Sequence, residues 1–329
     1  MATSQLTKHA TKQPKKTRRV QLQQSVIGYA FLAPMTILSL VFILYPIIGA
    51  FRYAFYDWSG IGKPRDFVGW YHFGRVARDP SFWDAVKHTL IYTVVQIPLQ
   101  LTLALALALV LNNPRLRLTT FYRAVYFLPV VTAPAVIASV LRLLLGELGK
   151  SPPAWMVDLG IMTVYSGFLA NPILVLPTII VIGTWHTFGY NLVFFLAALQ
   201  TIPAELYEAA TIDGAGRIAR FRYITIPLIR PVGGIIVFLA ILGALQLFDM
   251  VWVLTQGGPV GASETVATYI YRAAFVPPGS GQLPNLGRSA AAAVFWSILI
   301  MVISLVYTLY LRRANRRNAN DAADGVARV

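Results

Sequence analysis

Six stretches of the sequence are each long and apolar enough to cross a membrane as a helix. Crossing a hydrocarbon core of about 30 Å takes about 20 predominantly apolar residues. The stretches lie at about 26–50, 89–111, 121–145, 173–199, 228–254 and 289–311. Pro129 and Pro134 lie inside the third stretch, and such prolines are tolerated where neighbouring helices satisfy the carbonyl groups that they free. The pattern therefore predicts an all-α integral membrane protein with six packed transmembrane helices.

The composition excludes most soluble classes of protein. Hydrophobic residues make up 57% of the chain and charged residues only 12%, compared with roughly 25% charged residues in an ordinary soluble domain. So few charges cannot cover the surface of a soluble enzyme of 329 residues. The absence of cysteine excludes thiol chemistry and disulfides. The four histidines form no ligand pair at helical spacing, so we expect no metal site.

Most of the positive charge falls on one side of the predicted membrane. The formal net charge is +15. With both termini in the cytoplasm, the count assigns to that side 18 of the 28 Lys and Arg residues but only five of the 13 acidic residues. Cytoplasmic segments of membrane proteins carry an excess of Lys and Arg, so this topology explains the charge without nucleic acid as a partner. We therefore predict a multi-pass protein with both termini cytoplasmic.

The same pattern divides the chain into three segments. Residues 1–25 form a basic cytoplasmic arm, 26–311 form the membrane domain, and 312–329 form a cytoplasmic tail. The arm's charge serves orientation, with contact to anionic lipid headgroups as the alternative. The first apolar stretch is longer than the apolar region of a signal peptide and precedes no small-residue cleavage pattern, so we expect it to be retained. The outer regions at about 51–87 and 146–172 are irregular and predict no particular fold.

The cytoplasmic loop at about 200–227, between the fourth and fifth stretches, is longer than a simple connection needs. Pro203 and Glu205 are typical of a helix start, because the first turn needs no proline N–H and favours an acid. A short helix over 206–211, a turn at Gly214 and Gly216, and a second basic helix over 217–223 follow. Such a helix–turn–helix can dock a cytoplasmic partner or rest on the lipid surface, and the pattern alone leaves both open.

The residues of this loop resemble a family signature. Glu208-Ala209-Ala210 is followed after three residues by Gly214, and after nine more by Ile224-Thr225-Ile226-Pro227. This arrangement is similar to the signature loop of binding-protein-dependent ABC importer permeases, which is Glu-Ala-Ala, three residues, Gly, nine residues, Ile-x-Leu-Pro. Ile226 stands where that signature has leucine.

Further segments resemble the carbohydrate-uptake branch of that family, and in particular the first permease of the maltose and glycerol-phosphate type. They are Phe31-Leu32-Ala33-Pro34, Phe67-Val68-Gly69-Trp70, Ile212-Asp213-Gly214-Ala215 and Leu254-Thr255-Gln256-Gly257-Gly258-Pro259. The resemblance covers about 26–311 and implies a permease in a bacterial or archaeal inner membrane. The implied partners are a second, similar permease, two cytoplasmic ATPase subunits, an extracytoplasmic sugar-binding protein and a small sugar.

The resemblance also implies roles for the loop. Glu208 would pair with a basic residue in a cleft of the ATPase, Ala209 and Ala210 would allow a close fit, and Gly214 would make the turn, with Asp213 and Pro227 completing the motif. Without the resemblance, Glu208 is a solvated acid near a helix start. The chain has no Gly-x-x-x-x-Gly-Lys-Ser/Thr loop. We therefore expect no enzyme activity and no bound cofactor, with ATP and Mg²⁺ on the partner ATPase.

Polar side chains inside the membrane stretches are the candidates for the path of the solute, because polar groups there are costly. Gly183, His186, Thr187 and Tyr190 follow i, i+3, i+4, i+7 and share one helical face in the fourth stretch. Imidazole, hydroxyl and phenol groups suit a sugar. In the family, the sugar-contacting face follows a tryptophan that matches Trp185, which supports this face. A packed interhelical hydrogen bond is the alternative for His186, and packing is the alternative for Thr187 and Tyr190.

The fifth stretch adds two further candidates. Gln246 is its deepest polar residue, and Asp249 lies nearer the outer end. Trp252 fits an aromatic belt. Gly257-Gly258-Pro259 is either an outer turn against which the binding protein rests or a plain loop.

Other functions give different expectations. A proton-coupled secondary transporter could use His186 and Asp249, but only one acid lies inside the stretches and no inverted repeat is visible. An ion channel would need a filter sequence, which we do not find. A permease for peptides or phosphonates would share the cytoplasmic loop but not the segments at 67–69 and 257–259.

Overall fold

The computed structural model describes residues 18–64, 66–113, 116–150, 154–160, 167–275 and 284–326. The first 17 residues of the basic arm, and residues 151–153 and 161–166 of the stretch at 146–172, lie outside the described residues. The chain divides into two compact units, residues 1–52 and 53–329. Within the described residues, five helices are long and apolar enough to span a membrane, or six if one bent pair counts as a single span. The prediction of an all-helical membrane protein is therefore confirmed.

The first unit is one long helical segment. Helix α1 (Arg18–Ser39) continues through a π-helical segment, η1 (Leu40–Leu44), into α2 (Tyr45–Tyr53). Residues Ile27–Tyr53 qualify as a membrane span, and none of their most apolar window is buried within the chain. A helix that exposes apolar side chains in this way is stable in lipid or against another protein rather than in water.

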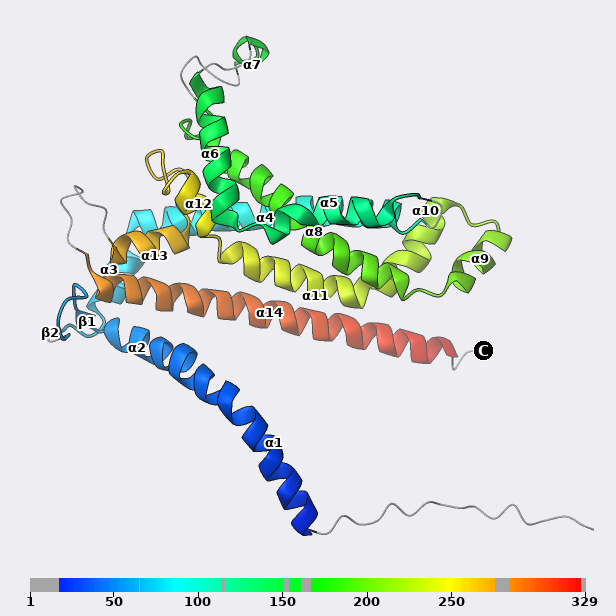
Figure 1. The fold of residues 1–329 in the computed structure, drawn as a ribbon, viewed down its shortest axis with the longest axis horizontal. Helices are drawn as coiled ribbons and strands as arrows, with labels where there is room; N and C mark the ends of the chain where they lie inside the picture. The colour runs from blue at the N-terminus through cyan, green and yellow to red at the C-terminus, as the bar shows by residue number, and fades with distance from the viewer. Residues whose placement is uncertain are drawn as a thin grey trace, which may run out of the picture. The chain divides into compact units, whose positions relative to one another are not determined.

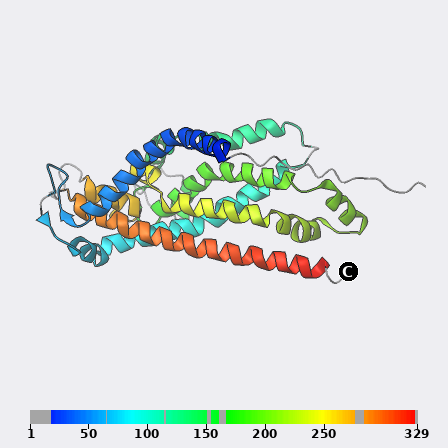
Figure 2. The ribbon, with the colours of Figure 1, turned by 90° about the horizontal axis from the view of Figure 1, so that it is seen from below.

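Four long helices make the body of the second unit: α4 (Pro80–Leu111), α8 (Val175–Gln200), α11 (Ile226–Leu245) and α14 (Leu286–Val326). Helix α4 packs along α8, and α11 contacts α4, α8 and α14 (Figures 1 and 2). Small residues of α4, Ala104 and Ala108, are buried against Leu192 and Leu196 of α8. Small side chains let membrane helices approach closely, which is the packing that replaces the hydrophobic effect between them.

The third predicted stretch is not one straight helix. It forms α5 (Thr119–Val131) and α6 (Pro134–Lys150), which meet at an angle of 89° (Figure 1). Thr132 between them is extended, with ψ at 134°. Pro134 has no N–H to bond to the preceding turn and disfavours a helical conformation at the residue before it, so the helix ends here.

The fifth predicted stretch, 228–254, lies within one candidate span, Arg217–Leu254, which contains a short local break. Helix α11 ends at Leu245, and the short α12 (Asp249–Leu254) begins after a turn at Gln246. At its other end α11 begins at Ile226, next to Pro227. Helix α10 (Arg217–Arg220) and the π-helical η2 (Phe221–Thr225) run directly into it. The wider π-helical turn, in which the Ile226 N–H reaches the Phe221 carbonyl, accommodates the proline within a continuous helix.

The end of the second unit away from α9 and α10 contains short elements, several of them in the region 51–87 where the sequence predicts no fold. Strands β1 (Tyr56–Asp57) and β2 (Asp66–Phe67) pair antiparallel. Helices α3 (Tyr71–Ala77) and α13 (Val266–Ala274) lie at this end, and the short α7 (Ala154–Asp158) lies beyond α6 (Figure 1). Helix α13 packs against α14 and α4, so this end is joined to the long helices of the body.

Candidate substrate cavity and coupling loop

A cavity of about 350 Å³ opens among α4, α8, the end of α11 and the start of α12. All six residues that the sequence suggests for the solute path line it, namely Gly183, His186, Thr187, Tyr190, Gln246 and Asp249. The rest of the lining is mainly apolar, with four further polar side chains: Tyr92, Gln96, Gln100 and Asn191. An apolar pocket with a few convergent polar groups is the usual form of a small-molecule site.

His186 is buried and takes part in an interhelical contact. Its Nε2 lies 3.2 Å from the carbonyl oxygen of Thr132, at the bend between α5 and α6. A carbonyl oxygen only accepts hydrogen bonds, so Nε2 is the donor in this contact. The imidazole therefore packs the bend against α8 and also lines the cavity.

Thr187 belongs to a hydrogen-bonded cluster with two glutamines of α4. The Gln96 amide donates to Oε1 of Gln100 and to Oγ1 of Thr187, at 2.9 Å in each case. The Thr187 hydroxyl contacts the same Gln100 oxygen. Both glutamines are buried, and our sequence interpretation did not select them. Their signal is present in the sequence, because two amides four residues apart in an apolar stretch must share one helix face.

Gly183 provides space rather than a polar group. A Cβ atom at this position would lie 2.2 Å from the hydroxyl oxygen of Tyr92, so a larger residue would displace that side chain. Tyr190 is 45% exposed and makes an edge contact with Phe194, with ring centroids 4.5 Å apart. Its phenol is accessible for a ligand.

Gln246 and Asp249 lie at the break between α11 and α12, and both are exposed. The Gln246 amide donates to the Leu242 carbonyl at 3.1 Å. Residues 246–248 separate the two helices, and Gln246 lies within the candidate span Arg217–Leu254, as predicted. The turn directs both side chains to the cavity.

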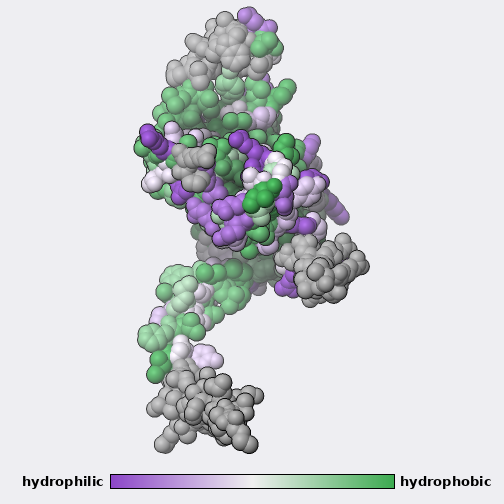
Figure 3. All heavy atoms as spheres, turned by 90° about the vertical axis from the view of Figure 1, so that its right-hand side faces the viewer, coloured by the Kyte–Doolittle hydropathy of each residue, from purple (hydrophilic) through white to green (hydrophobic). Residues whose placement is uncertain are grey.

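The loop at 200–227 forms the predicted helix–turn–helix. Helix α9 (Ala204–Ile212) carries Glu208, Ala209 and Ala210, and Glu208 and Ala209 are exposed. Gly214 has φ at +78°, a conformation that favours glycine, and it turns the chain towards α10. The end of the molecule that carries α9 and α10 faces the viewer in Figure 3, and many of its residues are hydrophilic.

Two side-chain contacts hold this loop together. The hydroxyls of Tyr207 and Thr225 are 2.9 Å apart, and Arg220 donates to the Thr211 hydroxyl at 2.9 Å. They join α9 to α10 and η2, and they leave the Glu208 side chain exposed on the surface of the loop. Among the described residues, no group of three or more His, Cys, Asp or Glu side chains is placed to hold a metal ion.

Comparison with known proteins identifies the family. Residues 80–318 match the model of the family described as "Binding-protein-dependent transport system inner membrane component". The chain belongs to this family. The matched residues include the cavity-lining helices and the whole cytoplasmic loop.

Several transport permeases are similar to the chain over most of their length. The lactose transport system permease LacF of Rhizobium radiobacter is 37% identical over 294 residues, which cover 89% of this chain and 95% of that protein. The trehalose/maltose permease MalF of Thermococcus litoralis is 30% identical, with 88% of this chain and 95% of that protein covered. A crystal structure of a bacterial ABC transporter that imports alginate superposes with a TM-score of 0.71 at 25% identity, covering 89% of this chain and 97% of that chain.

This membership settles the general role. The chain is a multi-pass inner-membrane permease subunit of a binding-protein-dependent ABC importer, of the first-permease type and homologous to carbohydrate permeases. A separate ATPase hydrolyses ATP in such an importer. The alternative of a proton-coupled secondary transporter is thereby set aside.

Proposed function

We propose that the chain forms half of the path of a sugar importer, in which its cavity receives the sugar and its cytoplasmic loop docks on an ATPase. One observation supports this most strongly: polar residues chosen from two separate stretches of sequence line a single cavity. Its partners are a second, homologous permease, two ATPase subunits and an extracytoplasmic sugar-binding protein.

The chemistry of the cavity supports a di- or oligosaccharide as the solute. Sugars present many hydroxyl groups and apolar ring faces, and the cavity offers amide, hydroxyl, imidazole and phenol groups among apolar side chains. The relatives are named for lactose, for trehalose and maltose, and for arabino-oligosaccharides. Gln96 and Gln100 hold the Thr187 hydroxyl in place beside the sugar.

The geometry of the cytoplasmic loop supports docking on an ATPase. Glu208 is exposed on α9 for an ion pair with a basic residue, and the small Ala209 and Ala210 allow close approach. Asp213 ends α9, where its N–H bonds to the Ala209 carbonyl at 3.0 Å, and Gly214 and Pro227 complete the motif. ATP and Mg²⁺ bind to the partner ATPase.

The membrane orientation follows from charge. Both termini lie in the cytoplasm of a bacterial or archaeal cell, on the side where Lys and Arg are in excess. The helix–turn–helix then faces the ATPase, and β1, β2, α3 and α13 face the binding protein.

An affinity purification from detergent-solubilised membranes tests this proposal. The tagged chain is expected to bring down a second permease and an ATPase, identified by mass spectrometry. The complex in proteoliposomes should then take up a radiolabelled sugar only with ATP inside and the binding protein outside. Recovery of a homo-oligomer without an ATPase would contradict the proposal.

A further inference from the structure

Four aromatic rings form a continuous set of contacts that begins at the cavity: Phe248, Trp252 and Tyr271 all contact one another, and Phe275 follows Tyr271. Phe248 lines the cavity. Its ring centroid lies 5.2 Å from that of Tyr271 and 6.0 Å from that of Trp252. Tyr271 lies 4.6 Å from Trp252 and 5.0 Å from Phe275. We call these four residues the aromatic row.

The row leads from the cavity to the surface. Trp252 is partly buried, Tyr271 is 36% exposed and Phe275 is 58% exposed. Exposure thus increases along α13 with distance from Phe248. The row begins at the turn that carries Gln246 and Asp249, so hydrogen-bonding groups stand at its inner end.

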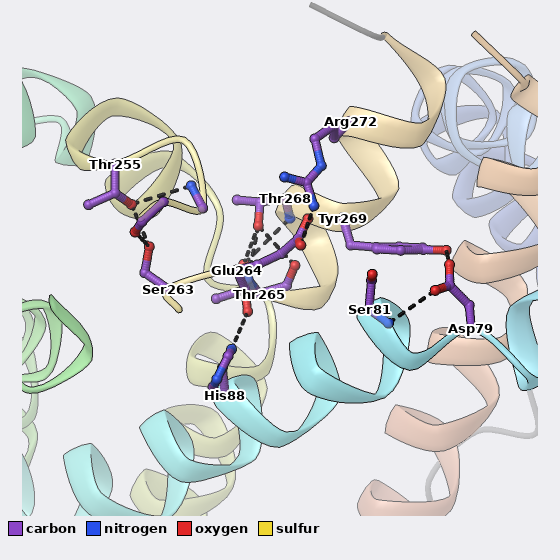
Figure 4. A network of polar contacts seen from close by, with 12 residues as sticks. Asp79, Ser81, His88, Thr255, Ser263, Glu264, Thr265, Thr268, Tyr269 and Arg272 are labelled. Atoms are coloured by element: carbon purple, nitrogen blue, oxygen red, sulfur yellow. Dashed lines mark hydrogen bonds and ion pairs between the residues drawn. The ribbon is translucent and has the colours of Figure 1, made fainter. Parts of the chain in front are cut away.

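A polar network anchors α13, the helix that carries Tyr271 (Figure 4). Thr265 and Thr268 form a capping box at the helix start, and Arg272 pairs with the buried Glu264. Tyr269 points the other way, to Asp79 on α4. Residues two apart lie on nearly opposite sides of a helix, so the anchoring of Tyr269 directs Tyr271 outwards.

We propose that the aromatic row is a sugar-binding track, on which the apolar faces of a saccharide stack as it passes from the binding protein into the cavity. This inference rests on the proposed function. Neighbouring ring centroids lie 4.6 to 6.0 Å apart, so a saccharide can contact more than one ring at a time. The continuity of the row with the cavity favours a sugar over lipid or another subunit as the occupant.

The track predicts a specific defect. Replacing both Trp252 and Tyr271 by alanine should lower sugar uptake roughly three- to tenfold, as expected for losing one or two ring contacts. Hydrolysis of ATP driven by the loaded binding protein should continue, so more ATP is hydrolysed per sugar transported. The Trp252→Phe and Tyr271→Phe pair keeps the rings and should restore uptake.

The test uses the complete complex in proteoliposomes with its binding protein and radiolabelled lactose, maltose, trehalose and arabinotriose. Tyr310→Ala, on an exposed tyrosine of α14 outside the row, is the matched control. Uptake that falls while ATP hydrolysis and complex yield persist, with rescue by the phenylalanine pair, supports the track.

Three other outcomes are distinguishable. Unchanged uptake by the alanine pair would overturn the track and leave the importer intact. A parallel fall in uptake, ATP hydrolysis and melting temperature would show that the rings pack against lipid or another subunit, which also overturns it. A wild-type complex that assembles but transports none of the sugars would overturn the proposed function itself.

Discussion

The hydroxyl of Tyr269 donates a hydrogen bond of 2.6 Å to Oδ2 of Asp79, which joins α13 to the first turn of α4. Arg288 at the start of α14 donates to the same oxygen, so one carboxylate ties three helices together. Burial alone would raise the pKa of Asp79, but hydrogen bonds from Tyr269, the Ser81 amide and Arg288 outweigh burial and lower that pKa. The folded protein therefore favours the ionised form of the Asp79 carboxyl group.

This lowered pKa predicts a loss of stability in acid. The contribution of Asp79 is complete above its unfolded pKa of about 3.9 and is lost as the pH falls through the lower folded value. Asp79→Asn should remove it at every pH and lower the free energy of unfolding at neutral pH by about 1.5–3 kcal/mol. Thermal unfolding of the detergent-solubilised protein from pH 7 to pH 3 measures both effects. Asp84→Asn, at an exposed carboxylate on the same helix, should behave like the wild type.

Gly189 permits the close approach of α5 and α8. A Cβ atom there would lie 2.2 Å from the carbonyl oxygen of Tyr126, which is backbone and cannot move aside easily. Gly189→Ala should therefore lower the free energy of unfolding by about 1–3 kcal/mol through overpacking. Gly146→Ala, where a Cβ meets nothing within 4 Å, is the control and should be neutral or stabilising. Equal melting temperatures for the two variants would contradict this account of the α5–α8 contact.

Glu208→Lys should leave the protein inserted but break its coupling to the ATPase, because it places a cation where an ion pair is expected. We expect uptake and ATPase co-purification to fall at least tenfold at normal membrane abundance, which corresponds to about 1.4 kcal/mol or more. Glu205→Lys, one helical turn earlier on α9, controls for the added charge. Normal transport by the Glu208 variant would mean that this acid is only a solvated residue.

His186 and Tyr190 share the cavity-facing side of α8. Their combined replacement by alanine should lower uptake and solute-stimulated ATP hydrolysis without dissociating the complex. The His186 change also removes the contact with Thr132, so the melting temperature of the single variant His186→Ala separates packing from sugar binding. Unchanged transport of every sugar tested would show that these two side chains pack between helices and do not bind the sugar.

The spans and the α8 face could be predicted because they depend on local periodicity. Apolar length marks membrane helices, and a spacing of three and four places His186 and Thr187 on one side whatever surrounds them. The breaks at Thr132 and Gln246 could not be predicted from periodicity. The apolar pattern continues through both positions, and only the backbone conformation interrupts it.

The residues that α4 contributes to the cavity show a second limit of prediction from sequence. Gln96 and Gln100 are visible in the sequence as a pair on one face, but their importance depends on the packing of α4 against α8. The sequence around these two residues does not indicate which helix packs against this face of α4. The aromatic row also depends on tertiary packing, because it brings Phe248 before α12 into contact with Tyr271 on α13, across an intervening loop.

One helix runs without interruption from Arg217 through η2 to Leu245 and links the helix–turn–helix to the cavity. At 1.5 Å per residue it is roughly 40 Å long, and it begins in the cytoplasmic loop and ends at the turn that carries Gln246. In the proposed importer, a displacement of α9 and α10 would be carried along this helix to the turn at Gln246, which lines the cavity.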